Sequence, residues 1–146
     1  MEWIRQASKE DLARIAEIEI FNYRLNFYPI FQNDAFYFNE LQVPHLMEGY
    51  RKVVESVWVY DDDAVKGFIR LEGQQIKKLF VEPVLQRKGI GTALLDFAVR
   101  ERNASSLWVL EKNTGAIRFY EHHGFHLTDE KELEEDTTEY LVRMKR

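Results

Sequence analysis

The feature that most constrains the fold is the stretch VEPVLQRKGIGTALLDFA, residues 81–98. It places a basic pair and two glycines between an apolar run that stops at Pro83 and apolar residues that recur at helical spacing from residue 90. Proline cannot donate to a β-ladder and therefore stops the strand, while the recurrence predicts a helix over residues 89–102. The stretch thus predicts a strand, a glycine turn and a helix in direct succession.

The glycine turn predicts an anion site. The first turn of a helix carries free backbone N–H groups and the positive end of the helix dipole. Gly89 and Gly91 lack a Cβ and so let a phosphate approach the backbone, and Arg87 and Lys88 add positive charge at the rim. A turn that only packs the helix against the strand is the alternative. A Walker A loop is absent, and Leu94 replaces the third glycine of a dinucleotide-binding fingerprint.

The rest of the chain predicts a mixed sheet. A first strand over residues 2–8 leads into a capping box of Ser8 and Asp11, which starts a helix. Pro29 excludes a single helix through the aromatic-rich segment that follows, and another helix is expected over residues 46–54. Asn113 caps a short helix that ends at Gly124. Together with two hairpins, the order is β-α-α-β-β-β-α-β-α-β-β, which is typical of an α/β or α+β fold.

Composition indicates a soluble, cytoplasmic protein with a single domain over residues 1–146. The net charge of −5 argues against nucleic acid as a partner, because phosphate binding requires a basic face. The absence of cysteine excludes disulfides and thiolate chemistry. Neither a signal peptide nor an apolar run long enough to span a membrane is found in the sequence.

Two motifs resemble one known family. The stretch LFVEPVLQRKGIGTALLDFAV is similar to the acetyl-CoA motif [RQ]-x-x-G-x-[GA] of the GCN5-related N-acetyltransferase (GNAT) family. Downstream, LWVLEKNTGAIRFYEHHGF resembles the second signature of that family. The order of elements is similar along nearly the whole chain. The resemblance implies a GNAT-like α/β (α+β) fold, with a mixed, mostly antiparallel sheet of about seven strands and about four helices on both faces.

The resemblance also implies a site for acetyl-CoA as co-substrate. In the family, a bulge splays one strand from the next, and the cofactor arm fits in the gap. The thioester and pantetheine would be lined by backbone groups of Leu79, Phe80 and Val81. The pyrophosphate would be held by Gln86, Arg87, Lys88, Gly89, Ile90, Gly91 and Thr92. Asn113 would contact the cofactor arm, and Tyr120 would lie near the thioester sulfur.

The implied reaction is direct attack of a neutral primary amine on the acetyl carbonyl. The N–H of Val81 would stabilise the charge on the carbonyl oxygen, and Tyr120 would be the general acid for the departing thiolate. A packed aromatic is the other role open to Tyr120. No metal site is expected, because Gly124 ends the helix between His122 and His126. The alternative function is a CoA-binding or acetyl-CoA-binding sensor or interaction module without turnover.

The resemblance does not identify the general base or the acceptor amine. Some relatives carry a glutamate as the general base where this chain has Trp108. Four other carboxylates are candidates for the base, but each fits a solvated surface charge better: Glu17, Glu19, Glu72 and Glu111. The acceptor wall is expected from an aromatic cluster with Tyr23 and Tyr28 as its polar members, although a core role is open for each: Phe21, Tyr23, Phe27, Tyr28, Phe31, Phe36, Tyr37 and Phe38. The acidic residues 129–139 form either a rim that attracts cationic amines or a solvated loop.

The expected partner is therefore a small-molecule or peptide amine, with no nucleic acid and no membrane. The resemblance leaves a homodimer open.

Overall fold

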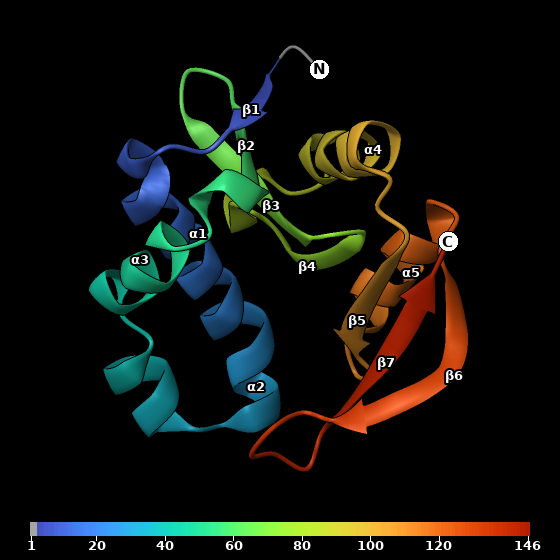
Figure 1. Ribbon diagram of the computed structural model, residues 1–146. Coiled ribbons are helices and arrows are strands. Elements are labelled where there is room, and N and C mark those ends of the chain that lie inside the picture. Colours follow the sequence, from blue (N-terminus) through green and yellow to red (C-terminus); the bar gives the residue numbers. More distant parts are fainter. Residues whose placement is uncertain (1–2) are drawn as a thin grey trace.

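The computed structural model describes residues 3–146, so Met1 and Glu2, at the start of the predicted domain and strand, lie outside the described residues. Seven strands form one sheet in the order β1-β2-β3-β4-β5-β7-β6 (Figure 1). Among the strands formed by residues 3–146, only β4 and β5 pair in parallel. The strands are β1 Ile4–Gln6, β2 Val57–Asp61, β3 Val65–Glu72, β4 Gln75–Val81, β5 Ser106–Leu110, β6 His126–Leu133 and β7 Tyr140–Lys145. The predicted mixed, mostly antiparallel sheet is confirmed.

Helices cover both faces of the sheet, as predicted. They are α1 Leu12–Asn22, α2 Tyr28–Phe31, α3 Val43–Arg51, α4 Ile90–Arg102 and α5 Thr114–His122. The core has two main parts, one on each face of the sheet. Phe68 of β3 packs with α1 and α3 on one face, and its neighbour Ile69 packs with α4 on the other. Both side chains are fully buried. None of the helices formed by residues 3–146 has the length and apolar character needed to cross a membrane.

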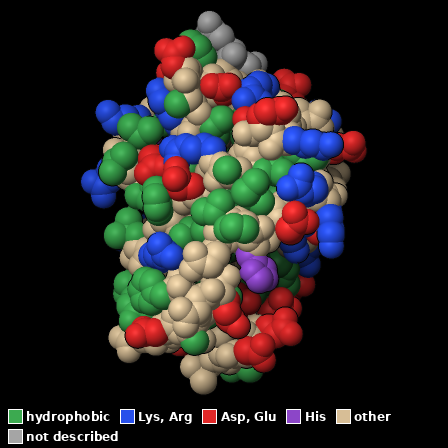
Figure 2. All heavy atoms as spheres, turned by 90° about the vertical axis from the view of Figure 1, so that its left-hand side faces the viewer, with side chains coloured by type: hydrophobic (Ala, Val, Ile, Leu, Met, Phe, Trp, Pro, Cys, Tyr) green, Lys and Arg blue, Asp and Glu red, His purple; other side chains and the backbone are tan. Residues whose placement is uncertain are grey.

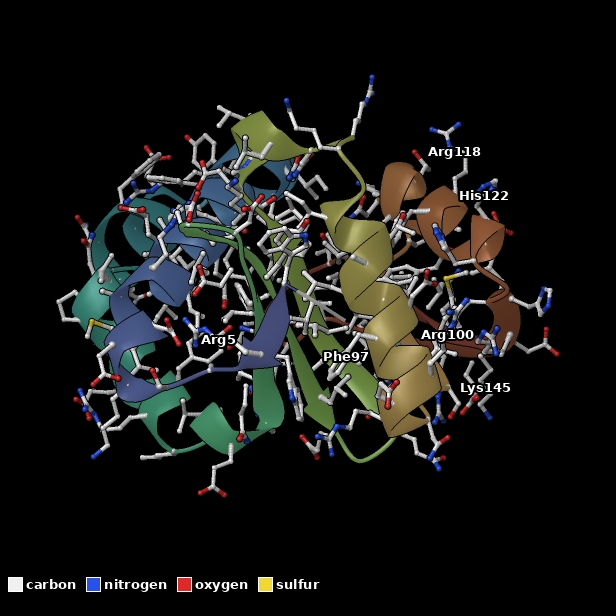
Figure 3. All side chains as sticks on the ribbon, turned by 90° about the horizontal axis from the view of Figure 1, so that it is seen from above. Arg5, Phe97, Arg100, Arg118, His122 and Lys145 are labelled. Carbon is white, nitrogen blue, oxygen red and sulfur yellow. The ribbon has the colours of Figure 1, made fainter. Side chains whose placement is uncertain are left out.

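Helix α4 lies close against the sheet beside α5 (Figure 3). Phe97 turns from α4 toward the sheet, and its ring centroid is 5.8 Å from that of Trp58 on β2. The close approach depends on Gly67 of β3, because a Cβ there would lie 3.1 Å from Ile90 and 3.2 Å from Leu94. These contacts fix the start of α4 above the sheet.

The capping box before α1 is confirmed. The backbone N–H of Ser8 donates to the Asp11 carboxylate at 2.8 Å, which is the reciprocal contact that the box requires. Asp11 also accepts two hydrogen bonds from the Arg5 guanidinium, at 2.8 and 2.9 Å. These contacts hold the pKa of Asp11 below its usual value, with the hydrogen bond from Arg5 as the largest cause.

No single helix runs through the aromatic-rich segment, as predicted, but the break does not lie at Pro29. Helical backbone continues from α1 through a π-helical turn at Tyr23–Phe27 into α2, which contains Pro29 in its first turn. Proline is tolerated there because the N–H of the first turn needs no intrahelical partner. The winding stops instead at Gln32, which adopts a left-handed conformation with φ of 51°. A second π-helical turn follows at Ala35–Glu40.

The helix expected over residues 46–54 lies earlier, as α3 at Val43–Arg51. Pro44 stands in its first turn, where a proline favours the start of a helix. The earlier start was readable from the sequence, because Val43, Leu46, Met47 and Tyr50 recur at helical spacing.

Strands β4 and β5 share a short seam. Their parallel pairing consists of Gln75 with Ser106 and Ile76 with Leu107. On the other edge of β4, the register toward β3 shifts after Ile76, so that Lys77 is the extra residue of a β-bulge. Beyond the seam the two strands diverge, and this divergence positions the site.

Candidate active site

A cleft of about 870 Å³ opens where β4 and β5 diverge. Its walls come from the π-helical turns and α2, from both strands, from the start of α5 and from the loop between β6 and β7. Among the residues that line it are Tyr23, Phe27, Phe31, Phe36, Tyr37, Lys78, Leu79, Phe80, Trp108, Asn113, Tyr120, Glu134, Glu135, Asp136 and Glu139. The cleft therefore brings together segments that are more than 100 residues apart in the sequence.

Backbone N–H groups of β4 face this cleft. The N–H of Glu82 donates to the carbonyl of Lys66 at 2.9 Å, which makes these two residues a hydrogen-bonded pair of the antiparallel ladder. Hydrogen-bonded and non-hydrogen-bonded pairs alternate along such a ladder. The amides of Val81 and Leu79, paired with Gly67 and Ile69, consequently point away from β3, toward the side from which β5 has withdrawn.

Tyr120 and Asn113 line the cleft from α5. Tyr120 is buried against Phe119 and Phe125, and burial raises the pKa of its hydroxyl well above the usual value. Asn113 caps α5, since its side-chain oxygen accepts a hydrogen bond from the N–H of Ala116 at 3.2 Å. The structure thus brings both predicted residues to one cleft with Leu79 and Phe80.

The glycine turn lies at the end of β4 and leads directly into α4. Arg87 and Gly89 adopt left-handed conformations, with φ of 67° and 85°, and Gln86 to Gly89 are exposed. The hydroxyl of Thr92, in the first turn of α4, lies 3.2 Å from Nε2 of His123, the residue that follows α5. The turn therefore presents an open loop in front of the positive end of a 13-residue helix.

The two glycines differ in what surrounds them. A Cβ on Gly89 would meet nothing within 4 Å, whereas a Cβ on Gly91 would lie 3.6 Å from Phe119 and 3.7 Å from Val81. A side chain at Gly91 would thus make ordinary van der Waals contact with α5 and β4, and the expectation that Gly91 lets a phosphate approach the backbone stays a prediction. Gly89 is the position that leaves open space in front of the backbone.

Asn22, which the sequence analysis did not single out, connects the helical layer to the glycine turn. This buried amide donates from Nδ2 to the carbonyls of Ile18 and Val81, both at 2.9 Å. Its oxygen accepts from Nε2 of Gln86 at 3.2 Å. Its partners on β4 and in the turn are 59 and 64 residues away, so no local pattern could have revealed it.

Five of the eight aromatic residues expected in the acceptor wall line the cleft: Tyr23, Phe27, Phe31, Phe36 and Tyr37. Tyr28 does not, because its hydroxyl donates to Asp34 on the outside. Phe21 and Phe38 are 41% and 47% exposed, and apolar side chains reach the surface among charged ones on this helical side (Figure 2).

The carboxylates considered as bases do not line the cleft. Glu17 pairs with Arg14 at 2.7 Å, Glu111 pairs with Lys131 at 2.8 Å, and Glu72 is exposed. Glu19 is fully buried, which corrects its assignment as a solvated surface charge. Figure 3 shows His122 projecting outward from α5, and no group of metal-ligating side chains is formed within residues 3–146.

The acidic loop between β6 and β7 borders the cleft. Figure 1 shows this loop reaching from the sheet toward α2, and it contributes Glu134, Glu135, Asp136 and Glu139 to the lining. Burial and the Glu134 carboxylate raise the pKa of Tyr37 to about 12, so the loop faces the aromatic wall closely enough to act on it electrostatically. Residues 129–139 were expected to form either an acidic rim or a solvated loop, and the structure favours a rim of the cleft.

A family model described as an acetyltransferase (GNAT) domain matches residues 54–127, about half of the chain. The peptidyl-lysine N-acetyltransferase YiaC of Escherichia coli (strain K12) is 34% identical over 89 residues, which cover 60% of this chain and 60% of YiaC. The chain thus aligns with about 60% of the length of this curated relative.

Solved structures show the same fold. The solution structure of apo-form YjaB from Escherichia coli has a TM-score of 0.74 at 22% identity, with 97% of this chain and 95% of that chain covered. The PaiA N-acetyltransferase of Thermoplasma acidophilum, in complex with coenzyme A, has a TM-score of 0.69 at 19% identity over 98% of each chain.

The fold and the divergent strands are consistent with the acetyltransferase (GNAT) domain that the family model describes. With the matching family model, the chain belongs to the GNAT family.

Proposed function

We propose that this protein transfers the acetyl group of acetyl-CoA to the side-chain amine of lysine in a peptide or protein. The observation that carries the proposal is the divergence of β4 from β5, which opens a cleft lined by Leu79 and Tyr120 and leaves the amides of Leu79 and Val81 without a partner strand on that side. The name of the relative YiaC, a peptidyl-lysine N-acetyltransferase, supports the acceptor.

Acetyl-CoA would lie along β4, with its pyrophosphate at the glycine turn. The free N–H groups at the start of α4 and the open space at Gly89 suit a phosphate. Asn113 and the backbone of β4 would then line the pantetheine arm. This placement brings the thioester beside the amides of β4 and the hydroxyl of Tyr120.

The acetyl transfer follows from this arrangement. The lone pair of the neutral amine forms a C–N bond with the acetyl carbon, and charge builds on the carbonyl oxygen, where the Val81 N–H donates a hydrogen bond. The C–S bond then breaks, and the thiolate takes the hydroxyl proton of Tyr120. Since burial raises the pKa of Tyr120, the residue holds that proton at neutral pH.

The cleft suits a cationic amine on an aliphatic stem. The acidic side chains of the β6–β7 loop attract positive charge to the entrance. The aromatic rings of the wall offer apolar surface to methylene groups and their faces to an ammonium group. A lysine side chain has both parts.

Turnover with matched peptides tests the proposal. One peptide carries a single lysine and a blocked N-terminus, and the other carries arginine at that position and a free N-terminus. Release of CoA from acetyl-CoA is expected with the lysine peptide and not with the arginine peptide. Tight CoA binding without turnover on any amine would instead support the non-catalytic CoA-binding module.

A further inference from the structure

His123, the residue that follows α5, is a half-buried histidine that the proposed acetyl transfer does not use. Its Nδ1 lies 2.8 Å from the carbonyl of Phe119 in the last part of α5, and its Nε2 lies 3.2 Å from the hydroxyl of Thr92 in the first turn of α4. The rings of His123 and Phe119 are also close, with centroids 4.6 Å apart. The imidazole therefore bridges the end of α5 and the start of α4, two helices that lie beside each other in Figure 3.

The contact with Phe119 decides which ring nitrogen carries the proton. The backbone N–H of His123 donates to the carbonyl of Tyr120 at 3.0 Å, which leaves the Phe119 carbonyl to the imidazole. A carbonyl only accepts hydrogen bonds, so Nδ1 is the donor. In a neutral imidazole Nε2 is then an acceptor, and the Thr92 hydroxyl donates its single hydrogen to it. In an imidazolium both nitrogens donate, and the hydroxyl hydrogen is free for another acceptor.

The Thr92 hydroxyl stands at the start of α4. Gly89 precedes the first helical residue, and the N–H of Ala93 donates to its carbonyl at 3.0 Å. The N–H groups of residues 89–92 come before this bond and are the free donors on which the proposed phosphate site depends. Side chains of a helix lean toward its N-terminus, so Thr92 carries its hydroxyl toward the same end. A hydroxyl that donates to His123 offers an anion only lone pairs, whereas a released one offers it a hydrogen.

We propose that His123 is a positioning residue that turns the hydroxyl of Thr92 toward the pyrophosphate of CoA, and that it does so in its protonated form. The inference rests on the proposed function, which places the pyrophosphate at the glycine turn. The imidazolium takes its proton from water, and its Nε2–H donates to the oxygen of Thr92. The hydroxyl hydrogen is then donated to a phosphate oxygen. The positive charge of the imidazolium adds to that of Arg87 and Lys88 at the rim.

The consequence is an affinity for CoA that depends on pH. Histidine is the side chain whose charge ordinarily changes between about pH 5 and about pH 8. CoA is expected to bind most tightly at the acidic end of this range, where the imidazolium is populated. Binding weakens as pH rises, because the neutral ring takes the hydrogen of Thr92 back. A hydrogen bond to a charged group accounts for about tenfold or more in affinity.

Other titratable side chains belong to the elements around this contact. They are Lys88 before α4, Asp96 and Arg100 on α4, Arg118, Tyr120, Glu121 and His122 on α5, His126 on β6, and Arg146 after β7. Two of these, His122 and His126, carry imidazoles, and both are exposed. The His122 ring lies 5.4 Å from that of His123, and its side chain projects outward in Figure 3. These two histidines therefore serve as matched controls.

Calorimetric titration with dephospho-CoA between about pH 5 and about pH 8 tests the proposal. This probe keeps the pyrophosphate and lacks the terminal phosphate monoester of CoA, whose own charge changes near about pH 6. The Kd of the wild-type protein is expected to rise about tenfold across the range. His123→Gln has an amide that does not titrate, and Thr92→Val keeps the shape of threonine without its hydroxyl. Each is expected to reduce the rise to less than about threefold, whereas His122→Gln and His126→Gln keep it.

A purely structural role for His123 is the competing explanation. It predicts that His123→Gln weakens binding equally at every pH and keeps the full pH dependence, and this result would overturn the inference. A full pH dependence in Thr92→Val would overturn it too, because His123 would then act by its charge alone. Each variant is compared with itself across pH, and the two variants remove the contact from different helices, so a loss of stability in one leaves the test intact. A wild-type protein that binds no dephospho-CoA at any pH would overturn the proposed function, and the inference with it.

Discussion

Replacement of Asn22 with leucine removes the amide that joins α1, the end of β4 and the glycine turn. Leucine is close to asparagine in size, so the change chiefly deletes hydrogen bonds. The carbonyl of Ile18 lies inside α1 and keeps its helical partner. Gln86 is exposed, and water replaces Asn22 as the acceptor for its amide. The carbonyl of Val81 is the group that loses a buried donor.

The magnitude follows from that one carbonyl. A buried acceptor left without a partner costs about 1–3 kcal/mol in the free energy of unfolding. For a chain of this size, each kcal/mol lowers Tm by about 2–4 °C. The melting temperature of Asn22→Leu is therefore expected to fall by about 2–12 °C. Affinity for CoA should fall too, because Gln86 no longer holds the turn against the helical layer.

Thermal unfolding followed by circular dichroism measures the first effect, and calorimetric titration with CoA measures the second. Asn26→Ala is the matched control, because this exposed residue on the same helical segment makes only a long contact with Asn22, at 3.5 Å. A Tm for Asn22→Leu equal to that of the control would refute the argument that the Val81 carbonyl depends on this amide.

Three further outcomes are expected. Tyr120→Phe should keep CoA affinity and lower kcat toward about 10²-fold or more; full activity in steady-state kinetics would leave Tyr120 as a wall of the cleft. Replacement of Arg87 and Lys88 by alanine should weaken CoA binding most at low salt, where screening is weakest, and titrations at several salt concentrations would contradict this if the loss were constant. Asp11→Asn should lower Tm at neutral pH, because the pKa of Asp11 is depressed in the fold. Its contribution is present above the usual aspartate pKa and lost as pH falls through the folded value, so melts of both proteins should converge in acid.

Local signals predicted much of the fold. The capping box, the proline after β4, the glycine turn and the Asn113 cap each depend on residues within one or two helical turns, and each was found where the sequence placed it. The same local character made the site motif recognisable, since Gln86 to Thr92 and Asn113 belong to short stretches. The contacts that these stretches predict with the cofactor stay a prediction.

Contacts across the chain were not predictable in this way. Glu19 falls beside the apolar positions of α1, where a charge normally marks the solvent face, and Lys78, 59 residues away, makes its burial favourable. Phe21 has the opposite outcome: it stands three residues after the buried Ile18, at helical spacing, but it is 41% exposed. The helix buries two sides, against α3 and against the sheet, so a single apolar stripe does not describe it.

The two-residue seam between β4 and β5 makes the sheet two half-sheets held together at one end. A CoA arm in the gap would act as a missing strand, because it would accept hydrogen bonds that the ladder leaves unmade. Ligand bound only by the folded chain adds about 2.7 kcal/mol to stability at one hundred times its Kd. We therefore expect slow hydrogen exchange at the amides of Leu79 and Val81 only when ligand is present. The supply of CoA would then set the lifetime of the folded protein as well as its rate of turnover.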